Sequence, residues 1–242
     1  MKHILLFLSF WFLVGKISAQ DGVFFTFSCG DKPLKINEMV YKSKRGLTFE
    51  VCQCQFFVSN LTVHYKDGKK FQIKNSVHYT DVEIPKTLFW IPSQDFSLKN
   101  ADSLFFTFGL DSLENRSYRF KNPPENLMFW PDYLGGGYHY MKTNILYLTS
   151  DNQTNAFNCH IGRGQVYNSE NEPVSFIEND VKIKIPLKTF IKDGKVYAII
   201  NLDILTMFDY PNAALFTDYR GIMNNQEAMK MFSQNVKAAF EK

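Results

Sequence analysis

The chain has 242 residues, of which 27 are Lys or Arg and 24 are Asp or Glu, so its formal net charge at pH 7 is +3. This near balance argues against a nucleic-acid-binding protein, which needs a clustered basic face. After residue 19, no apolar and charge-free stretch reaches the roughly 20 residues of a transmembrane helix, so we expect the remainder to be soluble.

Residues 1–19 are typical of a cleavable secretory signal peptide. A basic start is followed by the apolar run 4–14 and by small residues that end at Ala19, where we place the cleavage site. The apolar run is too short to anchor the chain in a bilayer. Cleavage leaves 25 basic and 24 acidic residues, because two lysines are removed. We expect the mature protein, residues 20–242, to fold as a single domain in a periplasm or at a cell surface.

Short runs of aromatic and β-branched residues, separated by turns rich in Asp, Gly and Asn, predict a succession of β-strands. The chain contains 24 Phe and 12 Tyr, which suits the half-buried faces of packed sheets. The predicted strands are 23–28, 47–59, 61–65, 70–73, 77–82, 103–110, 137–149, 155–161, 181–185 and 195–201.

Two helical segments are predicted near the C-terminus. The first is a short turn at 202–208. The second is a helix at 225–242, where apolar residues recur at spacings of three and four and form one stripe. The stripe consists of Ala228, Met231, Phe232, Val236, Ala239 and Phe240. The predicted fold class is therefore mainly β, an antiparallel β-sandwich with a C-terminal α-helix.

Four cysteines remain in the mature chain: Cys29, Cys52, Cys54 and Cys159. An even number in an oxidising compartment is compatible with disulfides, although the sequence does not give their pairing. We expect Cys52 and Cys54 to share one face of a strand, too far apart to bridge each other easily. A bridge from one of them to Cys29 or Cys159 is plausible. There are two alternatives: this pair of thiols ligates copper, or the thiols remain free and buried.

The common catalytic motifs are missing from the sequence. It contains no G-x-S-x-G elbow, P-loop, dinucleotide-binding glycine run or H-E-x-x-H motif, and no pair of carboxylates stands out as a glycosidase pair. The run Gly135–Gly137 precedes a predicted strand, so we expect it to supply unusual backbone torsions and not a phosphate site. We therefore do not expect an enzyme.

Six segments stand out when the sequence is read in chain order. Five of them read FFVSNLTV (56–63) followed by KDG (66–68), VHYTD (77–81), FTFGLDS (106–112), NLMFW (126–130) leading to GY (137–138), and FNCHIG (157–162). The sixth is the helical segment 223–240. In this order the segments resemble the MbnP-like copper-binding family of secreted proteins, and the similarity spans about residues 22–240.

This resemblance implies a β-sandwich that binds one copper ion outside the cytoplasm, without catalysis. In some members a tryptophan oxidised to kynurenine is a ligand, and a diheme peroxidase-like partner performs the oxidation. By this resemblance Trp130 is the candidate for oxidation and His160 the first candidate imidazole, with His78 and His139 as further metal ligands. Imidazole is a suitable ligand for copper. The chain has Asp132 where the family usually carries a second tryptophan.

The alternative function is that of a metal-free module that binds a carbohydrate or a protein. In that case Trp90, Trp130 and Tyr133 would share one exposed patch and stack on the ligand, and the candidate histidines would lie far apart.

Overall fold

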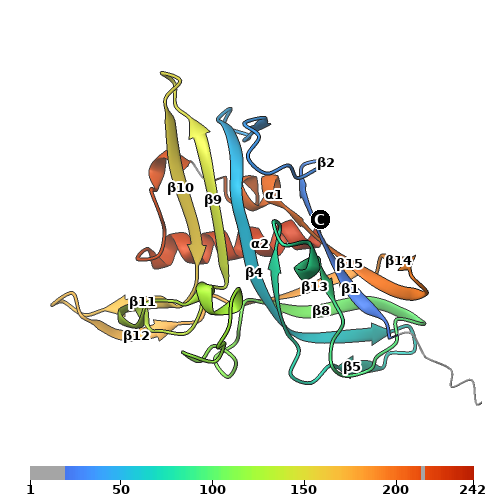
Figure 1. Cartoon of the computed structure of the whole chain (residues 1–242). Helices are drawn as coiled ribbons and strands as arrows, with labels where there is room; N and C mark the ends of the chain where they lie inside the picture. Colours follow the sequence, from blue (N-terminus) through green and yellow to red (C-terminus); the bar gives the residue numbers. More distant parts are fainter. Residues whose placement is uncertain (1–19, 214–215) are drawn as a thin grey trace, which may run out of the picture.

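The structure is a computed structural model, and it describes residues 20–213 and 216–242 (Figure 1). The predicted signal peptide lies outside the described residues. The first large sheet has the strand order β14 (Thr189–Lys192), β15 (Lys195–Asp203), β1 (Gly22–Cys29) and β2 (Lys32–Pro33), with β7 (Phe89–Trp90) also paired to β1.

The second large sheet is built around one long strand, β4 (Thr48–Tyr65). Its strand order is β10 (Thr154–Ile161), β9 (Met141–Leu148), β4, β8 (Ala101–Phe108) and β13 (Val181–Pro186), and the short strands β3 (Tyr41–Lys42), β5 (Lys70–Gln72) and β6 (Val77–Asp81) also pair with β4. A separate hairpin consists of β11 (Gly164–Tyr167) and β12 (Pro173–Ile177).

The helices are short except for the last one. They are the α-helices α1 (Ile204–Asp209) and α2 (Gln226–Glu241) and the 3-10 helices η1 (Pro85–Leu88), η2 (Glu125–Met128), η3 (Asp132–Leu134) and η4 (Phe216–Asp218). Asn225 caps α2, because its side-chain oxygen accepts a hydrogen bond from the backbone N–H of Ala228 at 2.9 Å. Within the described ranges, no helix combines the length and the apolar character that crossing a membrane requires.

The predicted fold class is confirmed: the protein is mainly β, with antiparallel sheets and a C-terminal helix. One strand pair departs from the antiparallel arrangement. β1 and β15 run parallel over residues 22–28 and 197–203. They come from opposite ends of the described chain, so no short hairpin dictates an antiparallel pairing between them.

β4 is continuous where two strands were predicted. The expected break falls at Asn60, which has a φ of 56°, and the register of β4 with β8 shifts between Ser59 and Thr62. This β-bulge bends the strand without ending it. The first part of β4 pairs with β9 and the later part with β8, so the strand changes direction between these neighbours in Figure 1.

The cysteine expectations need two corrections. All four cysteines are free thiols, so no bridge joins Cys52 or Cys54 to Cys29 or Cys159. The β4–β9 register also shifts between residues 51 and 53, and this bulge disrupts the alternation: Cys54 is buried, whereas Cys52 is half-buried beside Glu50. Burial raises the pKa of Cys54 to about 12, which keeps that thiol protonated and makes it a poor copper ligand.

Phe56 joins the two sheets and α2 in the core. Its side chain is fully buried, and its ring lies 5.9 Å from that of Phe25 on β1 and 5.5 Å from that of Phe240 on α2. Phe27 and Phe108 complete the cluster of rings around it. Edge-on and tilted contacts of this kind add to the free energy gained by burying the rings.

We predict that Phe56→Ala lowers the free energy of unfolding by about 3–5 kcal/mol, because it removes a buried ring and leaves a cavity between three elements. Denaturant unfolding at pH 7 measures the change. Ile191→Ala is the control, since Ile191 is 75 % exposed and its truncation is expected to change stability by less than about 0.5 kcal/mol. Equal effects of the two substitutions would contradict this account of the core.

Candidate metal centre

The segment that leads into β9 brings Trp130 and His139 to neighbouring positions. The backbone N–H of Trp130 donates to the carbonyl of Gly137 at 2.9 Å, and that of His139 donates to the carbonyl of Met128 at 2.6 Å. Residues 128–130 and 137–139 therefore lie side by side as a short antiparallel ladder, although the regular strand β9 begins only at Met141.

The glycine run closes this ladder. Gly135, Gly136 and Gly137 have φ values of 108°, 64° and 86°, a conformation that side-chain-bearing residues rarely adopt. The predicted unusual torsions are thus confirmed. They let the chain return directly from η3 to the ladder, which places His139 against the ring of Trp130.

Trp130, His139 and His160 form a row of neighbouring rings. The ring centroids of Trp130 and His139 are 4.7 Å apart, and those of His139 and His160 are 5.2 Å apart, in edge-to-face contacts. Trp130 is fully buried, and its indole N–H donates to the carbonyl of Leu134 at 3.0 Å. Three of the four predicted metal-site residues therefore meet at one place.

Each imidazole uses one nitrogen for a hydrogen bond that fixes its tautomer. Nδ1 of His139 lies 3.0 Å from the carbonyl oxygen of Met128, which can only accept, so Nδ1 carries the proton. Nε2 of His160 lies 2.8 Å from Oδ1 of Asn144, so in this ring Nε2 carries the proton. The side-chain amide of Asn144 in turn donates to Oε1 of Gln53 at 3.0 Å.

The lone pairs therefore lie on Nε2 of His139 and on Nδ1 of His160. Nε2 of His139 is buried and has no hydrogen-bond partner among the described residues. A buried polar atom without a partner is uncommon, because it loses its bonds to water and gains nothing in return. Hydrogen-bonding one ring nitrogen while leaving the other free is how proteins orient a metal-ligating histidine.

Burial keeps both imidazoles neutral. It lowers the pKa of His139 to about 3, with the nearby Lys142 and His160 acting in the same direction, and it lowers the pKa of His160 to about 4, again assisted by Lys142. Lys142 is itself partly buried, and its ammonium donates to the carbonyl of Leu127 at 2.6 Å. Both lone pairs are therefore available at neutral pH without the loss of a proton.

His78, the remaining predicted ligand, lies in a different environment. Its ring stacks between Phe25 and Trp90, with centroid distances of 5.4 and 5.1 Å, and its Nε2 lies 2.7 Å from the carbonyl of Thr87. These contacts belong to the packing between the sheets. His64 is also apart from the row, stacked on Phe105 at 4.0 Å. Within residues 20–213 and 216–242, no three His, Cys, Asp or Glu side chains form a group that could hold a metal ion.

The shared aromatic patch of the metal-free alternative does not form. Trp130 is fully buried and Trp90 is 6 % exposed, so neither ring can stack on a ligand that approaches from solvent, and only Tyr133 is open at 72 %. Asn144 and Lys142 were not among the residues predicted for the site. Alternation along β9 and its pairing with β10 place them near His160, and neither relation can be read from the sequence without the strand register.

We predict that His78 makes the folded state sensitive to acid. Burial lowers its pKa to about 4, whereas an unfolded histidine titrates near 6.5, so the unfolded state binds more protons below pH 6.5. The stabilisation that neutral His78 contributes to the folded state is complete above pH 6.5 and is lost as the pH falls toward 4. Between pH 7 and pH 5 the wild type should lose about 2 kcal/mol more unfolding free energy than His78→Phe, which keeps the ring stack but does not titrate. Urea unfolding at each pH measures these free energies. Equal losses of unfolding free energy by the two proteins between pH 7 and pH 5 would refute this prediction.

Comparison with known proteins identifies the family of this chain. The family model described as MbnP matches residues 22–229. Among solved structures, MbnP from Methylosinus trichosporium is similar, with a TM-score of 0.52 and 13 % identity over 80 % of this chain and 78 % of that one, a level of identity that supports the fold alone. No curated protein matches the sequence significantly. The model match covers most of the chain, and this protein therefore belongs to the MbnP family.

Proposed function

We propose that this protein binds one copper ion between His139 and His160 and acts in copper handling, without catalysis. The observation that carries the proposal is the unpartnered buried Nε2 of His139 beside a second neutral imidazole. Both rings are already neutral and oriented, so an ion would displace neither a proton nor an existing hydrogen bond from them.

The separation of the rings fits one shared ion. A ring nitrogen lies about 1.1 Å from the ring centroid and a metal–imidazole bond is about 2.0 Å long, so two imidazoles on one ion have centroids at most about 6 Å apart. The 5.2 Å between His139 and His160 satisfies this limit. His78 is left out of the proposed site, because its ring is stacked between Phe25 and Trp90.

The donor set favours copper over zinc. A structural zinc site generally has four protein ligands and a catalytic one three, whereas the described residues here offer two imidazoles and no third His, Cys, Asp or Glu beside them. Imidazole binds copper strongly, and copper lies above zinc in the usual order of affinities for a nitrogen site. Family membership supports the same choice, through the copper-binding role that the sequence resemblance implies.

Trp130 is the residue that would complete the site. An unmodified indole offers only an N–H donor, which is already bonded to Leu134, so it cannot ligate a metal. A ring-opened kynurenine at this position would place an aromatic amine and a ketone beside His139. The diheme peroxidase-like partner implied by the resemblance would catalyse the oxidation. Export of the mature chain to a periplasm or cell surface belongs to the same proposal.

We predict that the mature protein binds one equivalent of copper, measured for Cu(I) by competition with a chromogenic chelator and for Cu(II) by titration, with the cysteines kept as purified. His139→Ala and His160→Ala should each abolish binding or weaken it at least about 100-fold, because each removes one of two imidazole donors. His64→Ala is the matched control and should bind like the wild type, since His64 stacks on Phe105 away from the site. If both variants bound copper as tightly as the wild type, this assignment would be refuted.

We predict that protein isolated from its native host carries an oxidised Trp130, detected by mass spectrometry of the peptide that contains it. Such protein should bind copper more tightly than unmodified protein from a heterologous host, because it offers an additional donor beside His139. Trp130→Phe isolated from the native host should show only the weaker affinity. A native protein that binds copper tightly with an intact indole at position 130 would exclude this role.

A further inference from the structure

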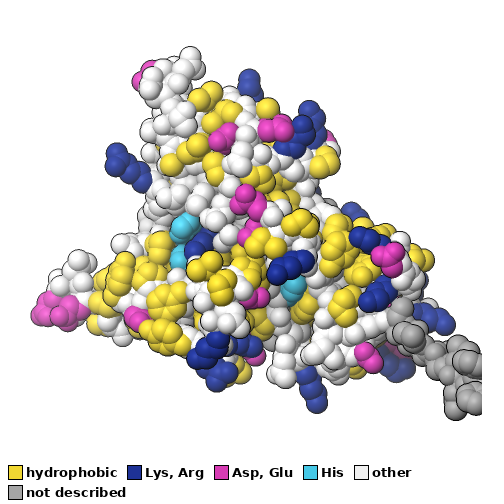
Figure 2. All heavy atoms as spheres, viewed as in Figure 1, with side chains coloured by type: hydrophobic (Ala, Val, Ile, Leu, Met, Phe, Trp, Pro, Cys, Tyr) yellow, Lys and Arg dark blue, Asp and Glu magenta, His cyan; other side chains and the backbone are white. Residues whose placement is uncertain are grey.

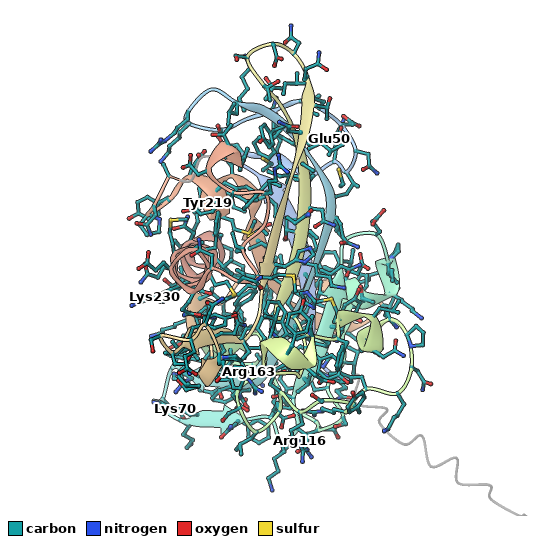
Figure 3. All side chains as sticks on the ribbon, turned by 90° about the vertical axis from the view of Figure 1, so that its left-hand side faces the viewer. Glu50, Lys70, Arg116, Arg163, Tyr219 and Lys230 are labelled. Carbon is teal, nitrogen blue, oxygen red and sulfur yellow. The ribbon has the colours of Figure 1, made fainter. Side chains whose placement is uncertain are left out.

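Arg163 ties together the two segments that carry the candidate ligands. It lies two residues beyond the end of β10 and three beyond His160, and its guanidinium donates to the carbonyl of Gly135 at 2.6 Å. The same group contacts Oε1 of Glu178 at 2.9 Å from Nε and at 2.7 Å from the terminal nitrogen, and it reaches the carbonyl of Asn115 at 3.3 Å. Arg163 is labelled in Figure 3.

A second set of hydrogen bonds holds the other end of the glycine run. The side-chain oxygen of Asn115 accepts from the backbone N–H of Tyr138 at 2.8 Å, and its amide donates to the hydroxyl of Tyr140 at 3.1 Å. That hydroxyl also donates to Glu178, the partner of Arg163. The residues on both sides of His139 are thus connected to Arg163 through a buried chain of bonds, in which Asn115 is 2 % exposed and Tyr140 is fully buried.

Two of the three glycines, Gly135 and Gly137, fit closely against this network. A Cβ atom at Gly135 would lie 2.7 Å from Cδ of Arg163, and one at Gly137 would lie 2.3 Å from Oδ1 of Asn115. Real Cβ atoms do not approach other atoms so closely, so the glycines allow the loop to sit directly on the arginine and the asparagine. The carbonyl of Leu134, next to the run, is also held, by the side-chain amide of Gln165 at 3.0 Å.

We propose that Arg163 is a positioning residue for the copper site: it holds the His139 loop against the end of β10 and thereby sets the position of the His139 imidazole relative to His160. This inference rests on the proposed function. A guanidinium suits the task, because its planar fork can hold a carboxylate and two carbonyls at the same time, whereas a lysine ammonium is a single flexible point charge. Partners that orient ligating histidines typically change metal affinity 10- to 100-fold when they are removed.

The test compares wild type, Arg163→Lys and the control Arg116→Lys. Arg116 lies in the neighbouring loop and is exposed, and it is also labelled in Figure 3. Arg163→Lys keeps a positive charge opposite Glu178, and a cooperative thermal transition establishes that the variant is folded. The first readout needs no copper: nitrogen NMR of the His139 ring in the copper-free protein at pH 7. We expect the wild type and Arg116→Lys to show one tautomer, with the proton on Nδ1, and Arg163→Lys to show a mixture of tautomers.

The second readout is the affinity for Cu(I) from chelator competition. Arg163→Lys should bind about 10- to 100-fold more weakly than the wild type, because Arg163 acts by positioning His139. An unchanged His139 spectrum in Arg163→Lys or an unchanged affinity for copper would each overturn the inference. A wild type that binds no copper would instead overturn the proposed function, and the copper-free spectra would still decide whether Arg163 positions His139.

Discussion

The backbone of Phe57 is the point on which the arrangement of the site depends. Its N–H donates to the carbonyl of Tyr140 at 2.9 Å, and its carbonyl accepts the N–H of Gly109 at 2.8 Å. The segment 109–140, which contains Trp130 and His139, therefore begins and ends at one residue of β4. A Cβ at Gly109 would lie 2.6 Å from the ring of Tyr140, so the two ends of the segment meet at the closest distance that the chain permits. Because these ends are held by the central strand, the intervening loop keeps a definite place on the sheet.

The register of β9 and β10 positions the second half of the site. Lys142 is paired with His160 and Thr143 with Cys159, so alternate side chains point to opposite faces of the sheet. Cys159 and Thr143 are fully buried, whereas His160 and Lys142 lie on the other face, which the loop covers. Gly162 follows, and a Cβ there would lie 2.6 Å from the ring of Trp130, so this strand end must be glycine for the loop to pack against it. The loop also excludes water from that face, and this burial keeps the imidazoles neutral.

The surface beside the site includes exposed apolar side chains. The β11–β12 hairpin exposes Val174 and Phe176, and Figure 2 shows hydrophobic side chains gathered over this end of the molecule. All five residues of β12 are exposed, and this explains why that strand was not predicted: with both faces open to solvent, there is no alternation of buried and exposed residues to detect. Phe176 also contacts the glycine run, where a Cβ at Gly135 would lie 2.7 Å from its ring.

The sequence by itself determined the alternation and turn chemistry of most strands, the stripe of the C-terminal helix, and the torsional role of Gly135–Gly137, because these are properties of neighbouring residues. It also supplied the identity of Trp130, His139 and His160 as candidates, through an ordered set of motifs. Only the tertiary structure decided that the rings of His139 and His160 lie side by side while His78 packs between the sheets, and that a bulge separates the environments of Cys52 and Cys54. These outcomes depend on strand register and on contacts between residues distant in the chain, and a single sequence carries no record of either.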